Sequence, residues 1–237
     1  MSAGRPSLAA IDYPLFRSHP SKHSVTRVAE NHTGWIRSRC HDSALKEEVQ
    51  ALQQGQWSRM WTGVPDLPKP SHHKPGDEHG WKQITWANPV EQVDWTTCNT
   101  LLARHGSELP TESQWEYACR AGASTPWLCA LGALKDHANL ADAIAKEAGA
   151  SLVAEKWTDC HSAHAPVGSF LANSFGLYDM QGNVAEWCRD EYGNYGTTRR
   201  DGDGMPLLGD GSSYRCYRGG GFSTLATGAR SAHRNRN

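Results

Sequence analysis

Residues 175–187 read Phe-Gly-Leu-Tyr-Asp-Met-Gln-Gly-Asn-Val-Ala-Glu-Trp, and no other stretch of the chain carries as much structural information. Within it, Asp179 and Glu186 lie seven residues apart around Gly182, with no Lys or Arg between them. Ca²⁺ prefers six to eight oxygen ligands, from carboxylates and backbone carbonyls on a sharply turned backbone. The pattern therefore indicates a hard-cation loop, in which Asp179, Glu186 and the carbonyls near Gly182 and Val184 supply about half of the ligands. The alternative is an acidic turn, in which Asp179 opens an Asx turn and Glu186 accepts a hydrogen bond from an amide.

Four further parts of the chain carry dense motifs of glycine, proline and aromatic residues. They are Pro89-Val90-Glu91-Gln92-Val93-Asp94-Trp95, Leu109-Pro110-Thr111-Glu112-Ser113-Gln114-Trp115-Glu116-Tyr117-Ala118, Ala165-Pro166-Val167-Gly168-Ser169-Phe170, and Tyr217-Arg218-Gly219-Gly220 with Arg230-Ser231-Ala232. Together with residues 175–187, and in the same order, they closely resemble the signature of the formylglycine-generating enzyme (sulfatase-modifying factor) family.

The resemblance implies an α+β fold, the irregular formylglycine-generating-enzyme variant of the C-type lectin fold. We expect it to be loop-rich, with short strands and two or three helices. We assign residues 46–237 to this domain and treat residues 1–45 as a poorly determined N-terminal segment. Domains of the family run on to a final strand with a Gly-Phe-Arg or Gly-Leu-Arg sequence, whereas this chain stops at Asn237. We therefore expect the domain to lack its closing C-terminal strand.

Two helices can be predicted from local chemistry. Apolar residues follow Asp94 at helical spacing, and Gly106 is placed to end that helix in a left-handed conformation. Thr111 and Gln114 form a Thr-x-x-Gln capping box for a second helix, which Gly122 is expected to end. Both helices are expected to serve as scaffold.

The resemblance also implies two structural Ca²⁺ sites. One is the loop with Asp179, Gly182, Val184 and Glu186. The other is formed where the family places an Asn, a neighbouring carbonyl, an Asp and a second carbonyl, at Asn139, Leu140, Asp159 and His161. This second loop departs from the family, because Cys160 and His161 replace a glycine and an aromatic residue. Such ions would pin the loops of a fold that has little regular secondary structure.

The enzymes of the family bind Cu(I) through two cysteines that follow the Arg-Gly-Gly turn, and soft thiolates are the ligands that Cu(I) selects. The equivalent turn here is Arg218-Gly219-Gly220-Gly221-Phe222, and the two cysteine positions fall at Thr224 and at or near Ala229. Neither residue supplies a thiolate. We therefore expect no copper cofactor and no catalytic residues of the oxidase type.

Composition excludes several other classes of protein. The net charge of the 237 residues is −1 and the pI is about 6.9, which gives no electrostatic footprint for nucleic acid or for an anionic membrane. The 7 cysteines form no Cys-x-x-Cys pair. No stretch of eighteen apolar residues is present. We expect a reduced, cytoplasmic protein.

Three functions remain open at this point. The first is a non-catalytic domain that binds a protein or small-molecule ligand through its C-terminal loops, at Phe222, Arg230, His233 and Arg234. An aromatic side chain beside arginines favours an anionic or carboxylate-bearing partner. The second is a formylglycine-generating oxidase with altered ligands. The third is the variable ligand-display protein of a diversity-generating retroelement. The sequence determines neither the identity of the ligand nor the oligomeric state.

Overall fold

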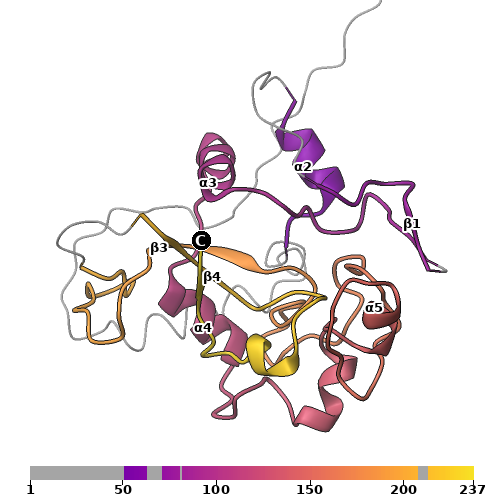
Figure 1. Ribbon diagram of the computed structural model, residues 1–237. Coiled ribbons are helices and arrows are strands. Elements are labelled where there is room, and N and C mark those ends of the chain that lie inside the picture. Colours follow the sequence, from indigo (N-terminus) through magenta and orange to yellow (C-terminus); the bar gives the residue numbers. More distant parts are fainter. Residues whose placement is uncertain (1–50, 63–70, 81, 208–212) are drawn as a thin grey trace, which may run out of the picture.

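The computed structural model describes residues 51–62, 71–80, 82–207 and 213–237. The predicted N-terminal segment, residues 1–45, lies outside the described residues. Within them the chain forms short helices and short strands joined by long loops, as Figure 1 shows. The predicted α+β class and its loop-rich character are confirmed.

The elements follow one another in a simple order. They are α2 (Gln54–Met60), β1 (Glu78–His79), β2 (Lys82–Gln83), α3 (Trp95–Arg104), α4 (Glu112–Arg120), η3 (Leu131–Asp136), α5 (Ala143–Glu147), β3 (Glu186–Glu191), β4 (Arg215–Arg218), η4 (Ala226–Ala229) and β5 (Asn235–Arg236).

An antiparallel sheet of β3, β4 and β5 organises the domain, with β4 in the middle. Its strands lie at the centre of Figure 1, with α4 against the sheet and α2 and α3 towards the top of the view. The last residues of the chain form β5, where Asn235 pairs with Tyr217 and Arg236 with Cys216. The expected lack of a further closing strand stays a prediction.

The two predicted helices are confirmed, and so is the capping box that begins the second one. Asp94 caps α3 by accepting a hydrogen bond from the backbone N–H of Thr97 at 2.8 Å, and Gly106 follows the helix with φ 69°. The Thr111 capping box begins α4. The left-handed residue that ends α4 is Ala121, with φ 46°, one position before the expected glycine.

The described residues contain two α-helices more than these. α2 begins at a capping box between Gln53 and Gln56, and α5 begins after Asp142, which accepts a hydrogen bond from the backbone of Ala145. Both helices are short, at 7 and 5 residues, so neither produces a clear apolar period in the sequence. Among the described residues, none of the helices has the length and apolar content that a membrane crossing requires.

Three buried clusters form the core. The first packs α4 against β3 and β4, the second joins α2 to α3, and the third lies beneath η3 and η4. Their buried members are Trp115, Cys119, Leu177, Met180, Cys188 and Cys216 in the first, Trp57, Met60, Leu101, Leu102 and Leu109 in the second, and Leu134, Ala138, Leu140, Ala226 and Ala229 in the third. Met180 of the first predicted cation loop lies in the first cluster, and Leu140 of the second loop lies in the third.

Candidate functional site

Asp179 lies buried in a left-handed turn with φ 56°. One carboxylate oxygen, Oδ2, accepts a hydrogen bond from the backbone N–H of Gly168 at 2.7 Å. The other oxygen, Oδ1, has no hydrogen-bond partner among the described residues. Burial raises the pKa of Asp179 to about 6, although the Gly168 N–H favours the ionised form. A cation ligated by Oδ1 would remove this unfavourable burial of a charged oxygen.

Glu186 begins β3, and its Oε2 accepts a hydrogen bond of 2.6 Å from the indole N–H of Trp115. Burial of the carboxyl group and, less strongly, the charge of Asp179 together raise its pKa to about 7, against the opposing effect of the Trp115 hydrogen bond. The two carboxylates that the sequence predicted as ligands therefore lie close enough to repel each other. A divalent cation between such groups would offset the repulsion.

Gly182 occupies the centre of this loop and leaves no room for a side chain. Its φ is 82°, and a Cβ atom there would lie 2.2 Å from the carbonyl oxygen of Asn139. Its N–H donates to the carbonyl of Gly219 at 2.9 Å, which ties the loop to the glycine turn. Val184, the remaining predicted ligand of this loop, lies next to Gly221.

In the second predicted cation loop, Asp159 is the common hydrogen-bond acceptor. Asp159 accepts hydrogen bonds from the backbone N–H groups of Leu140, at 2.8 Å, and His161, at 3.0 Å. Asn139 is fully buried, and its Oδ1 has no hydrogen-bond partner among the described residues. Burial raises the pKa of Asp159 to about 7. Cys160 adopts φ 69°, so this cysteine keeps the backbone conformation of the glycine that it replaces.

The ring of His161 is directed to a different contact. Its Nε2 lies 2.8 Å from the ammonium nitrogen of Lys82 on β2. Burial and, less strongly, the charge of Lys82 together lower the pKa of His161 to about 4. The ring is therefore engaged with β2, which leaves the backbone carbonyl of His161 as the group that matches the predicted role.

These loops fit an oxygen-ligated cation. The fit rests on the unpartnered buried oxygens of Asn139 and Asp179, one in each predicted loop. The described residues contain no group of three or more His, Cys, Asp or Glu side chains arranged to hold a metal ion. A cation here would consequently depend on backbone carbonyls and amide oxygens for much of its shell, which suits Ca²⁺ better than a transition metal.

The two positions that the family resemblance assigns to copper ligands both lie beside the glycine turn. The hydroxyl of Thr224 accepts a hydrogen bond from the N–H of Gly221 at 3.1 Å, and Ala229 is fully buried. A Cβ atom at Gly220 would lie 3.1 Å from Thr224 and 3.5 Å from the Cα atom of Ala229. The hydroxyl of Thr224 thus closes the turn, and Ala229 lies beside it. Neither residue carries sulfur.

The described cysteines form no disulfide, and most of them lie in the core or in partly buried positions. Burial raises the pKa of Cys98, Cys119 and Cys216 to about 12, and that of Cys188 well above its ordinary value. Thiols of this kind are poor metal ligands because the thiolate is the binding form.

The predicted ligand-binding residues fall into two places. Arg230, His233 and Arg234 line one cleft of about 480 Å³, whose lining does not include Phe222. Phe222 instead packs edge-on against His73 and His164, with ring centroids 5.9 Å and 6.1 Å apart. The grouping of these four residues from the sequence reflects their proximity along the chain.

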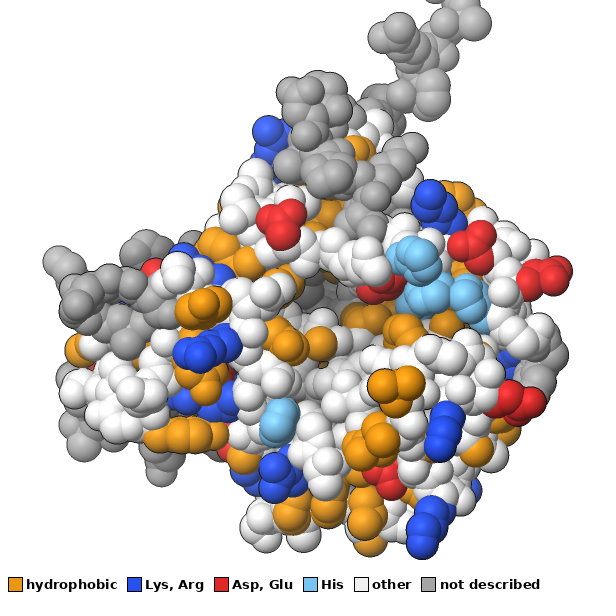
Figure 2. All heavy atoms as spheres, viewed as in Figure 1, with side chains coloured by type: hydrophobic (Ala, Val, Ile, Leu, Met, Phe, Trp, Pro, Cys, Tyr) orange, Lys and Arg blue, Asp and Glu red, His pale blue; other side chains and the backbone are white. Residues whose placement is uncertain are grey.

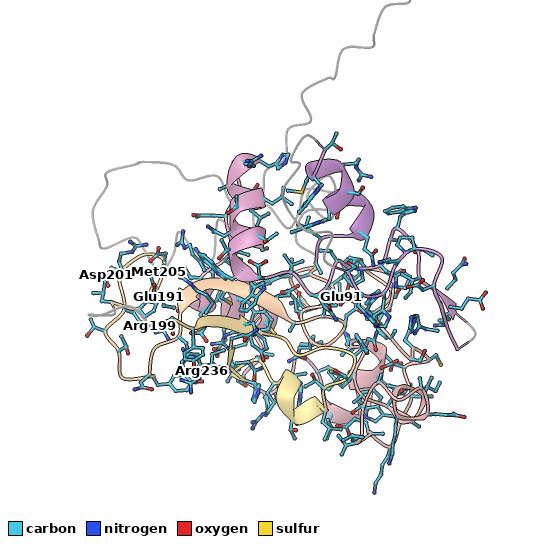
Figure 3. The ribbon with its side chains drawn as sticks, turned by 45° about the horizontal axis from the view of Figure 1, so that its top comes forward. Glu91, Glu191, Arg199, Asp201, Met205 and Arg236 are labelled. Atoms are coloured by element: carbon cyan, nitrogen blue, oxygen red, sulfur yellow. The ribbon has the colours of Figure 1, made fainter. Side chains whose placement is uncertain are left out.

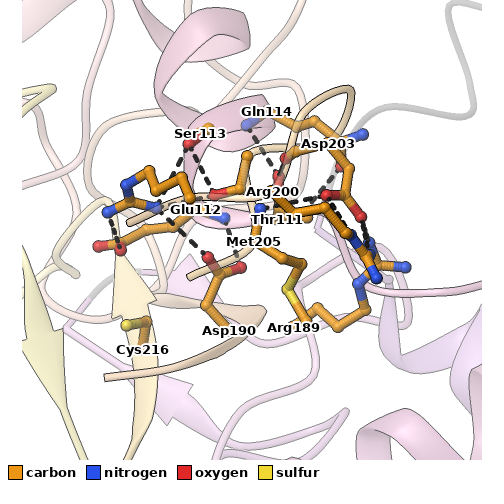
Figure 4. A network of polar contacts seen from close by, with 12 residues as sticks. Thr111, Glu112, Ser113, Gln114, Arg189, Asp190, Arg200, Asp203, Met205 and Cys216 are labelled. Atoms are coloured by element: carbon orange, nitrogen blue, oxygen red, sulfur yellow. Dashed lines mark hydrogen bonds and ion pairs between the residues drawn. The ribbon is translucent and has the colours of Figure 1, made fainter. Parts of the chain in front are cut away.

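Arg234 is held inside the structure. Its side chain is 4% exposed and forms an ion pair with Glu112, with Nη2 2.7 Å from Oε2. Arg218 joins the same carboxylate at 3.0 Å, and the N–H of Glu112 donates to Asp190. Figure 4 shows Glu112 and Asp190 among the polar contacts close to the N-terminus of α4. No local pattern in the sequence predicts this network, because Glu112 and Arg234 are 122 residues apart.

A group of histidines from separate loops also meets in the structure, and no sequence pattern predicts it. His73 and His79 share a hydrogen bond of 2.8 Å between their rings, and His73 packs edge-on against His164. Figure 2 shows histidine side chains gathered beside a hollow on this face of the molecule, and Figure 3 marks Glu91, which accepts a hydrogen bond from the His73 backbone. Histidines scattered over about ninety residues have no spacing that would predict this contact.

The fold and these loops define a class of protein: a loop-rich, C-type-lectin-like domain with a glycine turn beside oxygen-lined loops. The chain belongs to the sulfatase-modifying factor enzyme 1-like (FGE-sulfatase) family, whose model matches residues 21–237. The suspected family is confirmed.

Curated relatives match only in part. The serine/threonine-protein kinase pkn1 of Chlamydia caviae is 33% identical over 153 residues, which cover 63% of this chain and 22% of the kinase. The formylglycine-generating enzyme of Thermomonospora curvata is 36% identical over 107 residues, 44% of this chain and 33% of that enzyme. The chain thus spans about a fifth to a third of the length of these relatives.

Solved structures share the fold. PvdO from Pseudomonas aeruginosa superimposes with a TM-score of 0.61 at 24% identity, covering 80% of this chain and 73% of PvdO. Treponema denticola variable protein 1 gives 0.59 at 21% identity, covering 79% and 76%. At these identities the likeness shows the fold alone.

Proposed function

We propose that this chain is a non-catalytic member of the family that serves as a ligand- or protein-binding module. The observation that carries the proposal is the occupation of the two copper-ligand positions by Thr224 and Ala229. Thr224 already uses its hydroxyl to close the glycine turn, and Ala229 is fully buried. The other described thiols near the sheet belong to the core, with pKa values too high for easy thiolate formation.

The proposal includes calcium as a structural cofactor. Asp179 and Glu186, with the backbone at Gly182 and Val184, would hold one ion, and the Asn139 to His161 loop a second. When bound, Ca²⁺ supplies charge neutralisation and cross-linking of loops, and has no redox chemistry. The unpartnered buried oxygens of Asn139 and Asp179 support this assignment.

An oxidase with altered ligands is the alternative, and a peptide assay separates the two. The purified chain is incubated with Cu(I), O₂ and a Cys-x-Pro-x-Arg peptide, and the aldehyde product is measured by mass spectrometry. The Thermomonospora curvata enzyme serves as the positive control, and copper without protein sets the background. We expect no aldehyde above background. Aldehyde formed at a protein-dependent rate would reject the non-catalytic proposal and favour the oxidase.

A further inference from the structure

The cleft beside the C-terminal loops has an unusual charge. The residues that line it include Arg120, Arg230, His233 and Arg234 and no Asp or Glu from the described part of the chain. The whole chain, by contrast, has a net charge of −1. The charged side chains that line the cleft are therefore all basic, which favours a negatively charged occupant.

Two of the three arginines already have carboxylate partners. Arg120 pairs with Glu116 at 2.8 Å, and Arg234 pairs with Glu112. The Nε of Arg230 donates to the carbonyl oxygen of Thr227 at 2.8 Å, and within the described part of the chain no carboxylate pairs with Arg230. Its two terminal nitrogens are free to form a bidentate contact, and a carboxylate is the group that a guanidinium binds best in this way.

An aromatic surface lies in the same cleft. Tyr195 is 71% exposed, yet its hydroxyl donates to the carbonyl of Ala232 at 3.1 Å. The Arg234 guanidinium lies 4.7 Å from the centre of the Tyr195 ring and 4.6 Å from that of Tyr192. These contacts already hold the Tyr195 ring in place. A partner side chain can therefore pack on the ring with little further loss of conformational entropy.

The shape of the cleft indicates the size of the partner. Sites for small molecules bury most of the ligand surface. Here most of the lining residues are themselves exposed, among them Ser124, Thr125, Pro126, Tyr195 and Arg230. A small molecule would remain largely in water, whereas an extended chain can continue beyond the cleft and add contacts.

We propose that the cleft binds an acidic segment of a partner protein, with a carboxylate on Arg230 and a neighbouring side chain on Tyr195. His233 lies in the same lining and adds a hydrogen-bond donor. The inference rests on the proposed role of the chain as a binding module, and it names the chemical class of the partner.

The test uses a fluorescein-labelled peptide of sequence Glu-Glu-Tyr-Glu-Glu, with Gln-Gln-Tyr-Gln-Gln as the neutral counterpart. Binding is followed by fluorescence anisotropy at low ionic strength, where surface electrostatics are least screened. We expect the acidic peptide to bind and the neutral peptide to bind at least about tenfold more weakly, since several charge-assisted hydrogen bonds are lost.

Substitutions at Arg230 test whether the peptide binds in the cleft. Arg230→Gln should weaken binding about tenfold, the loss expected for one charge-assisted contact. Arg230→Lys should recover only part of it, because an ammonium cannot bind in bidentate fashion. Arg104→Gln, which removes the same charge from the exposed end of α3, should leave binding unchanged. The melting temperature of each variant reports whether the fold is kept.

Three outcomes would overturn the inference: no binding of the acidic peptide, equal binding of the neutral peptide, or equal weakening by Arg230→Gln and Arg104→Gln. Tight binding of benzoate with no preference for the peptide would assign the cleft to a small carboxylate and also reject the proposal. None of these results affects the aldehyde assay, so failure here and failure of the non-catalytic assignment can be told apart.

Discussion

Asn139 and Asn183 are joined by two hydrogen bonds across the interior of the domain. The N–H of Asn183 donates to the carbonyl of Asn139 at 2.7 Å, and the amide of Asn139 donates to Oδ1 of Asn183 at 3.3 Å. Both residues are fully buried. Since one belongs to each predicted cation loop, the loops share a single junction. The carbonyl of Asn183 also accepts a hydrogen bond from the N–H of Phe222, so the glycine turn is tied to the same point.

Removal of a predicted calcium ligand should remove the response of the fold to calcium. If Ca²⁺ is bound at about a hundred times its Kd, it contributes about 2.7 kcal/mol, which corresponds to about 5 °C or more in melting temperature. Asp179→Asn and Glu186→Gln should each abolish this shift in differential scanning fluorimetry. Asp201→Asn, an exposed carboxylate marked in Figure 3, is the control. A wild-type melting curve that EDTA leaves unmoved would contradict the prediction.

Gly182 should be irreplaceable for a steric reason. A Cβ atom there would lie 2.2 Å from the carbonyl oxygen of Asn139, and the nearest neighbouring atoms are backbone that cannot rotate away. We expect Gly182→Ala to cost about 3 kcal/mol or more, from the left-handed backbone and the overlap together.

Gly176→Ala is a matched control for this substitution. Gly176 has the same φ of 82°, but no atom beyond its chain neighbours lies within 4 Å of the position that a Cβ atom would take. The Gly176→Ala variant should lose only about 1 kcal/mol of unfolding free energy, from the left-handed backbone alone. Urea unfolding of both variants measures the difference, and equal losses would show that the contact with Asn139 is unimportant.

Glu112→Gln should be strongly destabilising. The substitution leaves the guanidinium groups of Arg218 and Arg234, which are 3% and 4% exposed, without their shared carboxylate. Loss of one partner from a buried ion pair costs about 3–5 kcal/mol. Asp136→Asn removes a carboxylate that is 50% exposed from its surface pair with Lys135 and should cost about 1 kcal/mol or less. Similar unfolding free energies for the two variants would mean that the buried network contributes little.

His164 should make the protein sensitive to acid. The side-chain amide of Asn88 lies 3.1 Å from Nδ1 of His164 and also donates to the His164 carbonyl at 2.8 Å. Asn88 Oδ1 accepts from Thr85, so its Nδ2 must be the group that donates to Nδ1. The His164 proton is therefore on Nε2. Burial and, less strongly, the neighbouring His73 together lower the pKa of His164 to about 4.

The sign of the effect follows from these pKa values. The folded pKa lies below the unfolded value of about 6.5, so between about pH 6.5 and 4 the unfolded chain binds more protons. The contribution of His164 to stability should therefore be lost as the pH drops through this window, by about 2 kcal/mol between about pH 7.5 and 5. The raised pKa values of Asp159, Asp179 and Glu186 act in the opposite direction, so the His164 effect is measured as a difference between wild type and variant. Guanidinium unfolding at both pH values measures how much unfolding free energy is lost on acidification. We expect His164→Gln to lose less than the wild type, and His72→Gln, which replaces an exposed histidine, to lose as much as the wild type. Equal acid losses in all three proteins would reject this role.

The sequence by itself was sufficient wherever the deciding interactions are local. The caps of α3 and α4 are hydrogen bonds between residues three apart, and the capping box of α4 was predicted correctly. The ordered motifs were also sufficient to assign the family and its loop-rich fold. The short helix α5 was missed, because 5 residues are too few to display a helical period.

Tertiary structure alone decided which side chains meet. It bonds Arg234 to Glu112 across 122 residues, places Phe222 against histidines from other loops, and leaves Arg230 as the arginine available in the cleft. It also directs the His161 ring to Lys82, 79 residues away. Such contacts depend on how the loops are arranged in space, so they cannot be predicted from amino-acid composition or from the spacing of residues along the chain. They are fixed when burial forces each charged or polar group to find a partner inside the folded chain.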